Sequence, residues 1–570
     1  MKQQFFLKLL LVSFISFGLA SCGKSNKEGR MIPKEAGFVM RIDGKSLSEK
    51  LPWSEIKQNP IFQQMYGDSN LPASLKSFLD NPDNAGVDPA SEFMLFSVTD
   101  SLGGYIGFQG NVKDEPAFKK FNGQATENGT ASEKDGVQFI AKNQLCIGWT
   151  KKKFVYILDA PQMAKMDELS ARMMRDSITP IEKSTRNINA TCKAIFDLSE
   201  SNTLAKNEHF SSLMNDKGDV QFWLNVEELN KNNQTNGALA MLNLDKFYKG
   251  NVTAGTLNFE NGKIQVNMKS YASDDMLKLF KEYGGGKINE DMIKRIPGKD
   301  IVALMALNFK PEGIRELIKL TGMDGLINMG ISKLGFTMDD FIKANKGDIV
   351  IGVSDLVFKT DSLATKQRSD TNVAIQTKPS FNFIFSAAIG DKDAFNKLVN
   401  AGKNLSKTPI MDSGKAPFAF NMNGTYFALS NSKENVDKYL GTEKTNFDFI
   451  SKINGEPFGG YVNLQSVLKS FGSADLKDSA KTIAYEASLQ MWENILWKGG
   501  NFKDGAVLQS MEVNLVDKAT NSLKQMNQYS AKLAPVMKEN HRKKKTESVA
   551  LDGFPDPENK IDSNAVKSTN

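Results

Sequence analysis

Alternating apolar and polar residues predict a chain rich in antiparallel strands. The clearest example is a pair of alternating segments, 253–259 and 264–268, joined by a turn that contains Asn-Gly. Asn-Gly favours a tight hairpin because both residues tolerate positive φ. Elsewhere, apolar residues at i, i+3 and i+4 predict helices over 311–320 and 392–399. Hairpins with separate helices, in place of regular strand–helix–strand repeats, predict an α+β fold with antiparallel sheets.

The same order of segments occurs twice, which predicts two tandem related halves, each mainly antiparallel sheet with packed helices. The paired segments are 32–43 with 296–308, 92–100 with 347–355, 112–121 with 389–398, 219–225 with 458–463, and 262–268 with 506–515. The offset between partners drifts along the chain, as loop insertions in a duplicated unit would cause. The alternative is two unrelated domains that share a strand-like composition.

At the amino end, an apolar run over 9–20, interrupted only by Ser13, Ser16 and Gly18, follows Lys2 and Lys8. A basic start, a short apolar run and small residues at a cleavage point are typical of an export signal, and the run is too short to span a bilayer. Cys22 comes directly after Leu-Ala-Ser, so the segment resembles a bacterial lipoprotein signal, in which cleavage precedes a cysteine that receives lipid. A plain secretory signal with a chance cysteine is the alternative.

These patterns divide the chain, whose 570 residues are too many for one hydrophobic core. Charged residues, prolines and serines replace apolar periodicity near the carboxyl end, which favours disorder there. The predicted divisions are a signal peptide at 1–21, a lipidated tether at 22–31, a first α+β repeat at 32–285, a second at 286–535 and a disordered polar tail at 536–570.

Composition narrows the function classes. A formal net charge of +6 over 570 residues gives no electrostatic case for nucleic acid. After Cys22 only Cys146 and Cys192 remain, both expected at buried strand positions. Two free buried thiols are favoured over a disulfide, although the sequence leaves the pairing open. We expect the lipid to be the membrane attachment, because no second apolar run is long enough to span a bilayer.

Motifs for catalysis or metal binding are missing from the sequence. Of the two histidines, His541 lies in the predicted tail and His209 stands alone. There is no H-E-x-x-H, no paired C-x-x-C and no phosphate-binding glycine loop, so we expect no metal and no cofactor. The carboxylate pairs at 274–275 and 339–340 precede helical runs, where Asp favours a helix start. The sequence therefore assigns no catalytic residue.

A short pattern, Asp-Ser followed by an apolar or small residue, recurs along the chain. It is similar to the O-glycosylation acceptor motif on exported proteins of some Bacteroidota. The candidate acceptors are Ser101, Ser177, Ser362 and Ser479. Ser101 and Ser362 follow corresponding predicted strands in the two halves and are expected in exposed loops.

Several segments together resemble a family of Bacteroidota cell-envelope lipoproteins, classed as a domain of unknown function. They are 19–22 at the predicted lipidation site, the opening strand at 32–43, 85–88 before the strand at Phe93, and 346–350. The resemblance implies a cell-envelope location and a duplicated α+β body, and it supplies no catalytic residues. An acidic run after the lipidated cysteine often marks surface exposure in such proteins, and 23–28 lacks one. We therefore expect the periplasmic face of the outer membrane, with the surface as the alternative.

The leading hypothesis is a lipid-tethered, non-enzymatic binding or scaffolding protein whose partners are the membrane, through its lipid, and an envelope protein or glycan. One alternative is an envelope hydrolase with a carboxylate-based site, which requires two facing carboxyl groups with different protonation. Another is an apolar-ligand carrier, which requires a dry cavity between sheet and helices.

Overall fold

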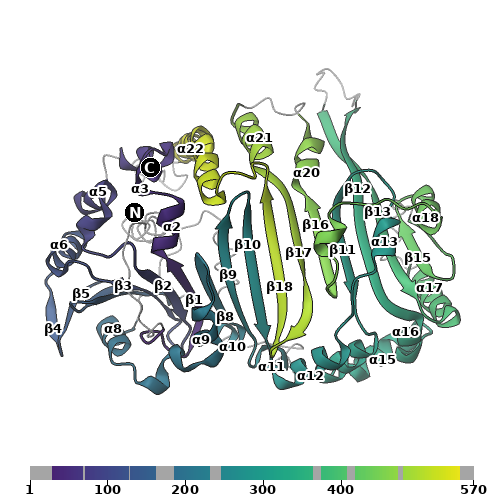
Figure 1. Ribbon diagram of the computed structural model, residues 1–570, viewed down its shortest axis with the longest axis horizontal. Helices are drawn as coiled ribbons and strands as arrows, with labels where there is room; N and C mark the ends of the chain where they lie inside the picture. Colours follow the sequence, from purple (N-terminus) through teal and green to yellow (C-terminus); the bar gives the residue numbers. More distant parts are fainter. Residues whose placement is uncertain are drawn as a thin grey trace, which may run out of the picture.

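Eighteen strands pair into one continuous antiparallel sheet in the computed structural model (Figure 1). The structure describes residues 29–67, 71–127, 129–161, 185–231, 245–363, 374–406, 418–472 and 479–551. The predicted signal peptide at 1–21 and Cys22 lie outside these residues. Helices and antiparallel strands both occur throughout the described chain, which confirms the α+β fold class.

The strands fall into two consecutive sets. The first set is β1 (Ala36–Asp43), β2 (Glu92–Val98), β3 (Tyr105–Asn111), β4 (Ser132–Lys134), β5 (Val137–Lys142), β6 (Leu145–Trp149), β7 (Lys153–Asp159), β8 (Val220–Asn225), β9 (Val252–Glu260) and β10 (Lys263–Tyr271). The second set is β11 (Ile301–Asn308), β12 (Asn345–Leu363), β13 (Ala374–Ile389), β14 (Ala419–Met422), β15 (Tyr426–Ser430), β16 (Phe458–Asn463), β17 (Trp492–Lys503) and β18 (Ala506–Leu515).

The order of strands across the sheet is similar in the two sets. It runs β4-β5-β6-β7-β3-β2-β1-β8-β9-β10-β18-β17-β16-β11-β12-β13-β15-β14. Outward from the β10–β18 pair, β9-β8-β1-β2-β3 on one side corresponds to β17-β16-β11-β12-β13 on the other. Each paired segment from the sequence falls on elements in equivalent places. A common origin of the halves stays a prediction, which superposition of their Cα traces tests.

Successive side chains of a strand point to opposite faces of the sheet. In the first half, apolar side chains occur on both faces. Val39 of β1 belongs to a core that is covered by α8 (Ile188–Phe196) and α9 (Glu208–Asn215) and contains buried Trp223. Ile42 of the same strand belongs to a core on the opposite face, with buried Phe118. The helices over that face are α2 (Gly44–Lys50), α3 (Trp53–Lys57), α4 (Pro60–Tyr66), α5 (Ala73–Asp80) and α6 (Glu115–Ala125).

The second half is also covered on both faces near its outer strands. Ile384 of β13 packs in a core with α13 (Glu290–Lys294), α18 (Lys433–Leu440) and α19 (Ile450–Ile453). Ala387 of β13 packs on the other face against α16 (Met338–Ala344) and α17 (Lys392–Ser406). The other α-helices are α10 (Val226–Asn230), α11 (Asp245–Tyr248), α12 (Asp274–Tyr283), α14 (Glu312–Leu320), α15 (Asp324–Lys333), α20 (Leu464–Phe471), α21 (Ser479–Met491) and α22 (Ser522–Leu551).

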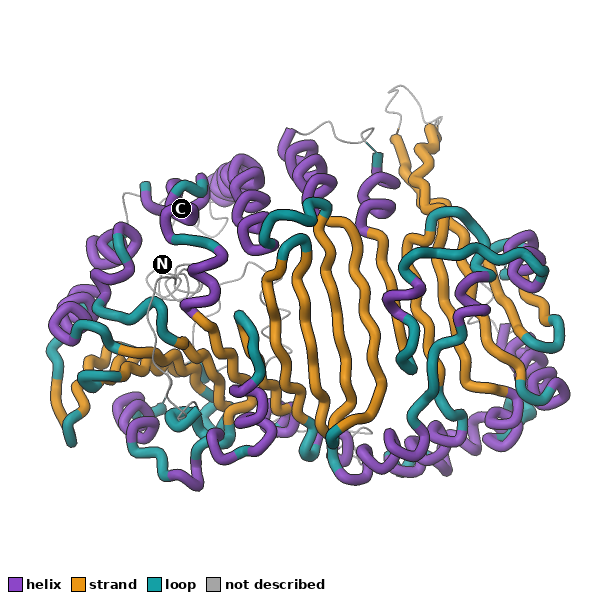
Figure 2. Tube along the Cα trace, in the orientation of Figure 1, coloured by secondary structure: helices purple, strands orange, loops and turns teal. Residues whose placement is uncertain are grey.

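The central strands are the barest part of the sheet. Figure 2 shows helices gathered beyond the two ends of these strands, and no described helix crosses the viewed face of β10, β18 and β17. None of the described helices combines the length and the apolar character that crossing a bilayer requires.

The carboxyl-terminal helix α22 packs back onto the first half. The Lys524 ammonium lies 2.7 Å from the Glu55 carboxylate, and the Asn59 side-chain amide donates to the Asn527 carbonyl at 2.9 Å. The helix continues to Leu551, whereas the sequence predicts a disordered tail from 536. The charged residues of this segment are mostly Lys and Glu, which are good helix formers and extend a helix already anchored by packing.

Two further expectations differ from the structure. The predicted tether at 22–31 already packs at its end, because the Gly29 carbonyl accepts hydrogen bonds from the Thr203 hydroxyl and the Ile32 amide. Cys192 lies in helix α8, whereas the sequence predicts a strand. Cys146 lies in β6 as predicted, and both thiols are free and buried. A hydrogen bond with Cys146, together with burial, raises the pKa of the Cys192 thiol.

Several local predictions are confirmed. Strands β9 and β10 form the expected hairpin, with Glu260 opposite Lys263 and Gly262 at φ 69°. The carboxylates at 274–275 lie in the first turn of α12. Asp340 and Thr337 form a capping box at the start of α16. Hydrogen bonds from Lys397 and Thr337 lower the pKa of Asp340 to about 2.

Asp291 of α13 gives a pH prediction. Burial raises its pKa, but hydrogen bonds from Lys444, Arg295 and Tyr426 outweigh burial and lower the pKa to about 2 from 3.8. Ionised Asp291 therefore stabilises the fold above pH 3.8, and this contribution is lost as the pH falls through about 2. We expect Asp291→Asn to lose less stability than wild type between pH 4 and pH 2 in thermal unfolding. Identical pH profiles would contradict the assignment.

Candidate binding groove

An open groove lies on the sheet where the two halves join, over β9, β10, β18 and β17. Its volume is about 450 Å³, which is within the range of small-molecule sites. Most of its lining residues are polar or charged, and they come from both halves. The lining residues are Asp216, Lys217, Ala254, Gly255, Thr256, Asn267, Met268, Lys269, Glu456, Lys498, Gly499, Asn501, Leu508, Gln509 and Ser510.

The floor of the groove is a row of polar side chains that strand register brings together. Thr256 of β9 lies opposite Asn267 of β10, which in turn lies opposite Ser510 of β18. Ser510 lies opposite Lys498 of β17. Directly opposed residues project on the same face of a sheet, so these side chains form one polar row across four strands.

The opposite face of the same strands is apolar. Leu257, Val266, Met511 and Trp497 form the neighbouring cross-strand row, one position along each strand. Because successive side chains alternate between faces, an apolar row on one side accompanies the polar row on the other. The polar floor is therefore a consequence of the sequence pattern of the central strands.

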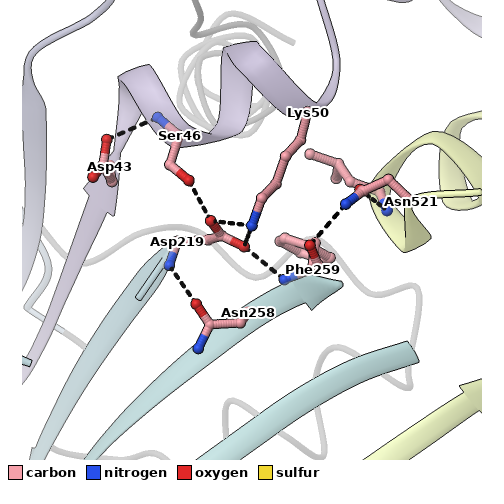
Figure 3. Close-up of polar contacts among 8 residues, drawn as sticks. Asp43, Ser46, Lys50, Asp219, Asn258, Phe259 and Asn521 are labelled. Carbon is pink, nitrogen blue, oxygen red and sulfur yellow. Dashed lines mark hydrogen bonds and ion pairs between the residues drawn. The ribbon is translucent and has the colours of Figure 1, made fainter. Parts of the chain in front are cut away.

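One wall of the groove, Asp216 and Lys217, is held in place by buried Asp219 at the start of β8. Figure 3 shows the Asp219 carboxylate among partners from α2 and β9. It accepts hydrogen bonds from the Ser46 hydroxyl at 2.5 Å and the Phe259 amide at 2.6 Å, and Lys50 forms an ion pair with it at 2.6 Å. The Asp219 side chain is 2% exposed. This network fixes the backbone two residues after Lys217.

The same wall is tied to the floor. The Gln221 side-chain amide donates to the carbonyls of Leu213 and Asp216, which closes the loop between α9 and β8. The Asp216 carboxylate accepts a hydrogen bond from the Lys269 ammonium of β10 at 2.8 Å, and this bond raises the pKa of Lys269. The wall is therefore positioned from three directions.

The other wall comes from the second half. The Glu456 carbonyl accepts a hydrogen bond from the Ile288 amide at 3.0 Å, and its carboxylate accepts one from the Asn501 side chain. The register of β17 shifts between Gly499 and Asn501, and Gly500 adopts φ 100° there. A side chain would be strained at this φ, so glycine permits the bulge that presents Asn501.

The groove carries unpaired positive charge. Its carboxylates, Asp216 and Glu456, are bonded to Lys269 and Asn501. Within the described ranges, neither Lys217 nor Lys498 forms an ion pair. The arrangement therefore offers cationic groups and side-chain amides and hydroxyls to a ligand.

The carboxylates with a resolved pKa shift do not include a candidate general acid. Among the described Asp and Glu residues whose pKa shift is resolved, every pKa is lowered. No cluster of His, Cys, Asp or Glu suited to a metal ion occurs among the residues that the structure describes. His209 stacks on Tyr271 with ring centroids 3.7 Å apart and is not among the groove lining residues, and position 541 lies in α22.

The candidate glycosylation sites are scattered. Ser101 is exposed in the turn between β2 and β3, next to Asp100, which accepts two hydrogen bonds from Arg186. Ser362 lies in β12 opposite Ile375, so the expectation of a loop there is wrong, because the β12–β13 hairpin extends further than its apolar pattern. Ser479 begins α21. Ser177 and Cys22 lie outside the described residues. Ser101, Ser362 and Ser479 are not among the lining residues of the groove.

Sequence reasoning missed the groove. Each floor residue is an ordinary polar strand position, and the row exists only through pairing between β10 and β18. The sequence feature that could have indicated it is the alternation of polar with apolar residues over 263–271 and 506–515. Such alternation is typical of strands that have one face open to solvent.

Comparisons with known proteins place the chain in a family without assigning an activity. Two solved structures, crystal forms IV and I of TP0453, match at TM-scores of 0.24 and 0.20 with 8% and 10% sequence identity. Each match covers 42% of this chain, and 80% and 79% of the respective matched chains. Likeness at these scores supports no inference. The search of curated proteins gives no match. A family model covers residues 29–447, most of the chain, and the protein therefore belongs to the family described as a domain of unknown function, DUF4836.

Proposed function

We propose that this protein is a lipid-anchored, non-enzymatic binding protein of the bacterial cell envelope, and that the groove between the halves is its binding site. The observation that carries the binding proposal is the polar floor, open on the central strands and flanked by walls that hydrogen bonds and an ion pair hold in place. Preorganised polar groups bind a ligand at a lower entropic cost than mobile ones. Scaffolding of a partner at the same face is part of this proposal.

Binding is favoured over hydrolysis by the state of the carboxylates. A carboxylate-based hydrolase needs an acid whose pKa is raised near the working pH. Among the described Asp and Glu residues whose pKa shift is resolved, none has a raised pKa. The groove carboxylates, Asp216 and Glu456, are each hydrogen-bonded to a donor of the chain itself. An apolar-ligand carrier is also less favoured, because the groove is open and a row of polar side chains crosses its floor.

The anchoring proposal rests on Cys22 and the residues before it, and it places the protein at the outer membrane of a Bacteroidota cell, facing the periplasm. We expect Cys22→Ala to move the protein from the membrane fraction to the soluble fraction in its native host. Mass spectrometry of the wild-type protein should show diacylglycerol on Cys22. A Cys22→Ala protein that remains membrane-bound would contradict the anchor.

The binding proposal predicts that blocking the floor abolishes partner capture. Asn267 is exposed at the centre of the floor, so Asn267→Trp should fill the groove. The matched control is Lys503→Trp, at an exposed β17 position outside the lining. In pull-downs from detergent-solubilised envelopes, we expect wild type and the Lys503 variant to recover one stoichiometric protein or glycan, and the Asn267 variant to lose it. Equal recovery by both variants would exclude the groove.

A further inference from the structure

The charges of the groove indicate which chemical class of ligand it binds, which its shape alone does not. Lys217 and Lys498 come from different halves, and neither forms an ion pair within the described residues. Lys498 is half-buried on the floor, where less water competes for its ammonium group than at an exposed site. The groove therefore favours a ligand that carries negative charge.

The uncharged groups of the floor suit hydroxyl-rich ligands. The hydroxyls of Thr256 and Ser510 have no hydrogen-bond partner among the described residues, and Asn267 is exposed between them. Hydroxyl and amide groups both donate and accept, as sugar hydroxyls do. Four neighbouring strands span about 14 Å at the usual strand spacing, which suits a short oligosaccharide.

Two observations disfavour other occupants. Each strand of the floor is paired on both sides, so an extended peptide finds no free strand edge to join. None of the described lining residues is aromatic, so they offer a neutral sugar no ring face on which to stack. The groove can therefore hold a ligand through charged groups and hydrogen bonds.

We infer that the groove binds an acidic glycan, an oligosaccharide whose carboxylates pair with Lys498 and Lys217 while its hydroxyls bond to the polar row of the floor. This inference rests on the proposed function and names the ligand class of the same site.

Isothermal titration calorimetry on the detergent-solubilised full-length protein tests the inference with matched probes. The acidic probe is tetragalacturonate, and its fully methyl-esterified form is the neutral control. We expect tetragalacturonate to bind at least about tenfold more tightly than the ester, and its affinity to fall as salt screens the charges. Lys498→Gln should weaken its binding about tenfold, and Lys503→Gln, an exposed lysine of the same strand, should leave it unchanged. Thermal unfolding verifies that each variant folds, and Lys217→Gln is the second groove variant.

The outcomes separate the ligand class from the site. The acidic-glycan inference is overturned if tetragalacturonate does not bind or if the ester binds equally well. It is also overturned if neither Lys498→Gln nor Lys217→Gln weakens the binding of tetragalacturonate. If tetraglutamate, an acidic peptide, binds while tetragalacturonate does not, and Lys498→Gln abolishes that binding, the acidic-glycan inference is wrong but the groove remains a binding site. If no probe binds and Asn267→Trp also leaves partner capture unchanged, the proposed function fails with it.

Discussion

Asp219→Ala is expected to destabilise the central sheet by about 3 kcal/mol, because it removes a buried carboxylate that accepts hydrogen bonds and pairs with a partly exposed lysine. The Asp219 side chain is 2% exposed, and its loss leaves the Lys50 ammonium and the Phe259 amide without their acceptor. Native-state hydrogen exchange of the β8 and β9 amides measures the change as the free energy of local opening.

The matched control is Asp216→Asn, three residues earlier in the same loop. Asp216 and Lys269 are 37% and 38% exposed, and exposed pairs contribute less than about 1 kcal/mol. We expect exchange in the Asp216 variant to stay close to wild type. Similar protection in the two variants would show that the Asp219 network does not hold this wall of the groove.

Ser510→Pro is expected to destabilise the junction between the halves by roughly 3 kcal/mol. Ser510 pairs with Asn267 of β10 and with Lys498 of β17, so it lies on an interior strand. Proline lacks the amide hydrogen and its ring crowds the neighbouring strand, which is why it is confined to edges and bulges.

Ser510→Ala separates the backbone effect from the side chain. Alanine keeps the amide and removes only the hydroxyl, so we expect exchange at β10 and β18 to stay near wild type. The proline variant should lose protection in both strands, because each is the other's partner over 263–270 and 507–514. Unchanged protection in the proline variant would mean that the halves do not share one sheet.

The sequence predicted those parts of the fold that depend on neighbouring residues. The β9–β10 hairpin follows from alternation around Gly262, and helix α17 follows from apolar spacing over a single turn. Cys192 was placed in a strand because a short apolar run does not distinguish strand from helix. The discriminating signal was Asn187, whose side chain caps α8 by accepting a hydrogen bond from the Ala190 amide.

Features that depend on distant pairing could not be predicted in the same way. Lys263 and Glu512 form an ion pair across the junction at 3.1 Å, yet nothing local to either residue specifies the other. The groove depends on the same pairing, since Asn267 and Ser510 come together only through the register of β10 with β18. The helical extension of α22 past 536 likewise depends on packing against α4 and α21.

The most direct test of the groove as a binding site is photo-crosslinking in the native host. A photoreactive amino acid replaces Asn267 in the floor or, as the control, Lys503 on the same sheet outside the groove. We predict that irradiation of intact cells gives a discrete adduct from position 267 and none from position 503. The absence of an adduct at 267, or equal adducts at both positions, would contradict a binding function for the groove.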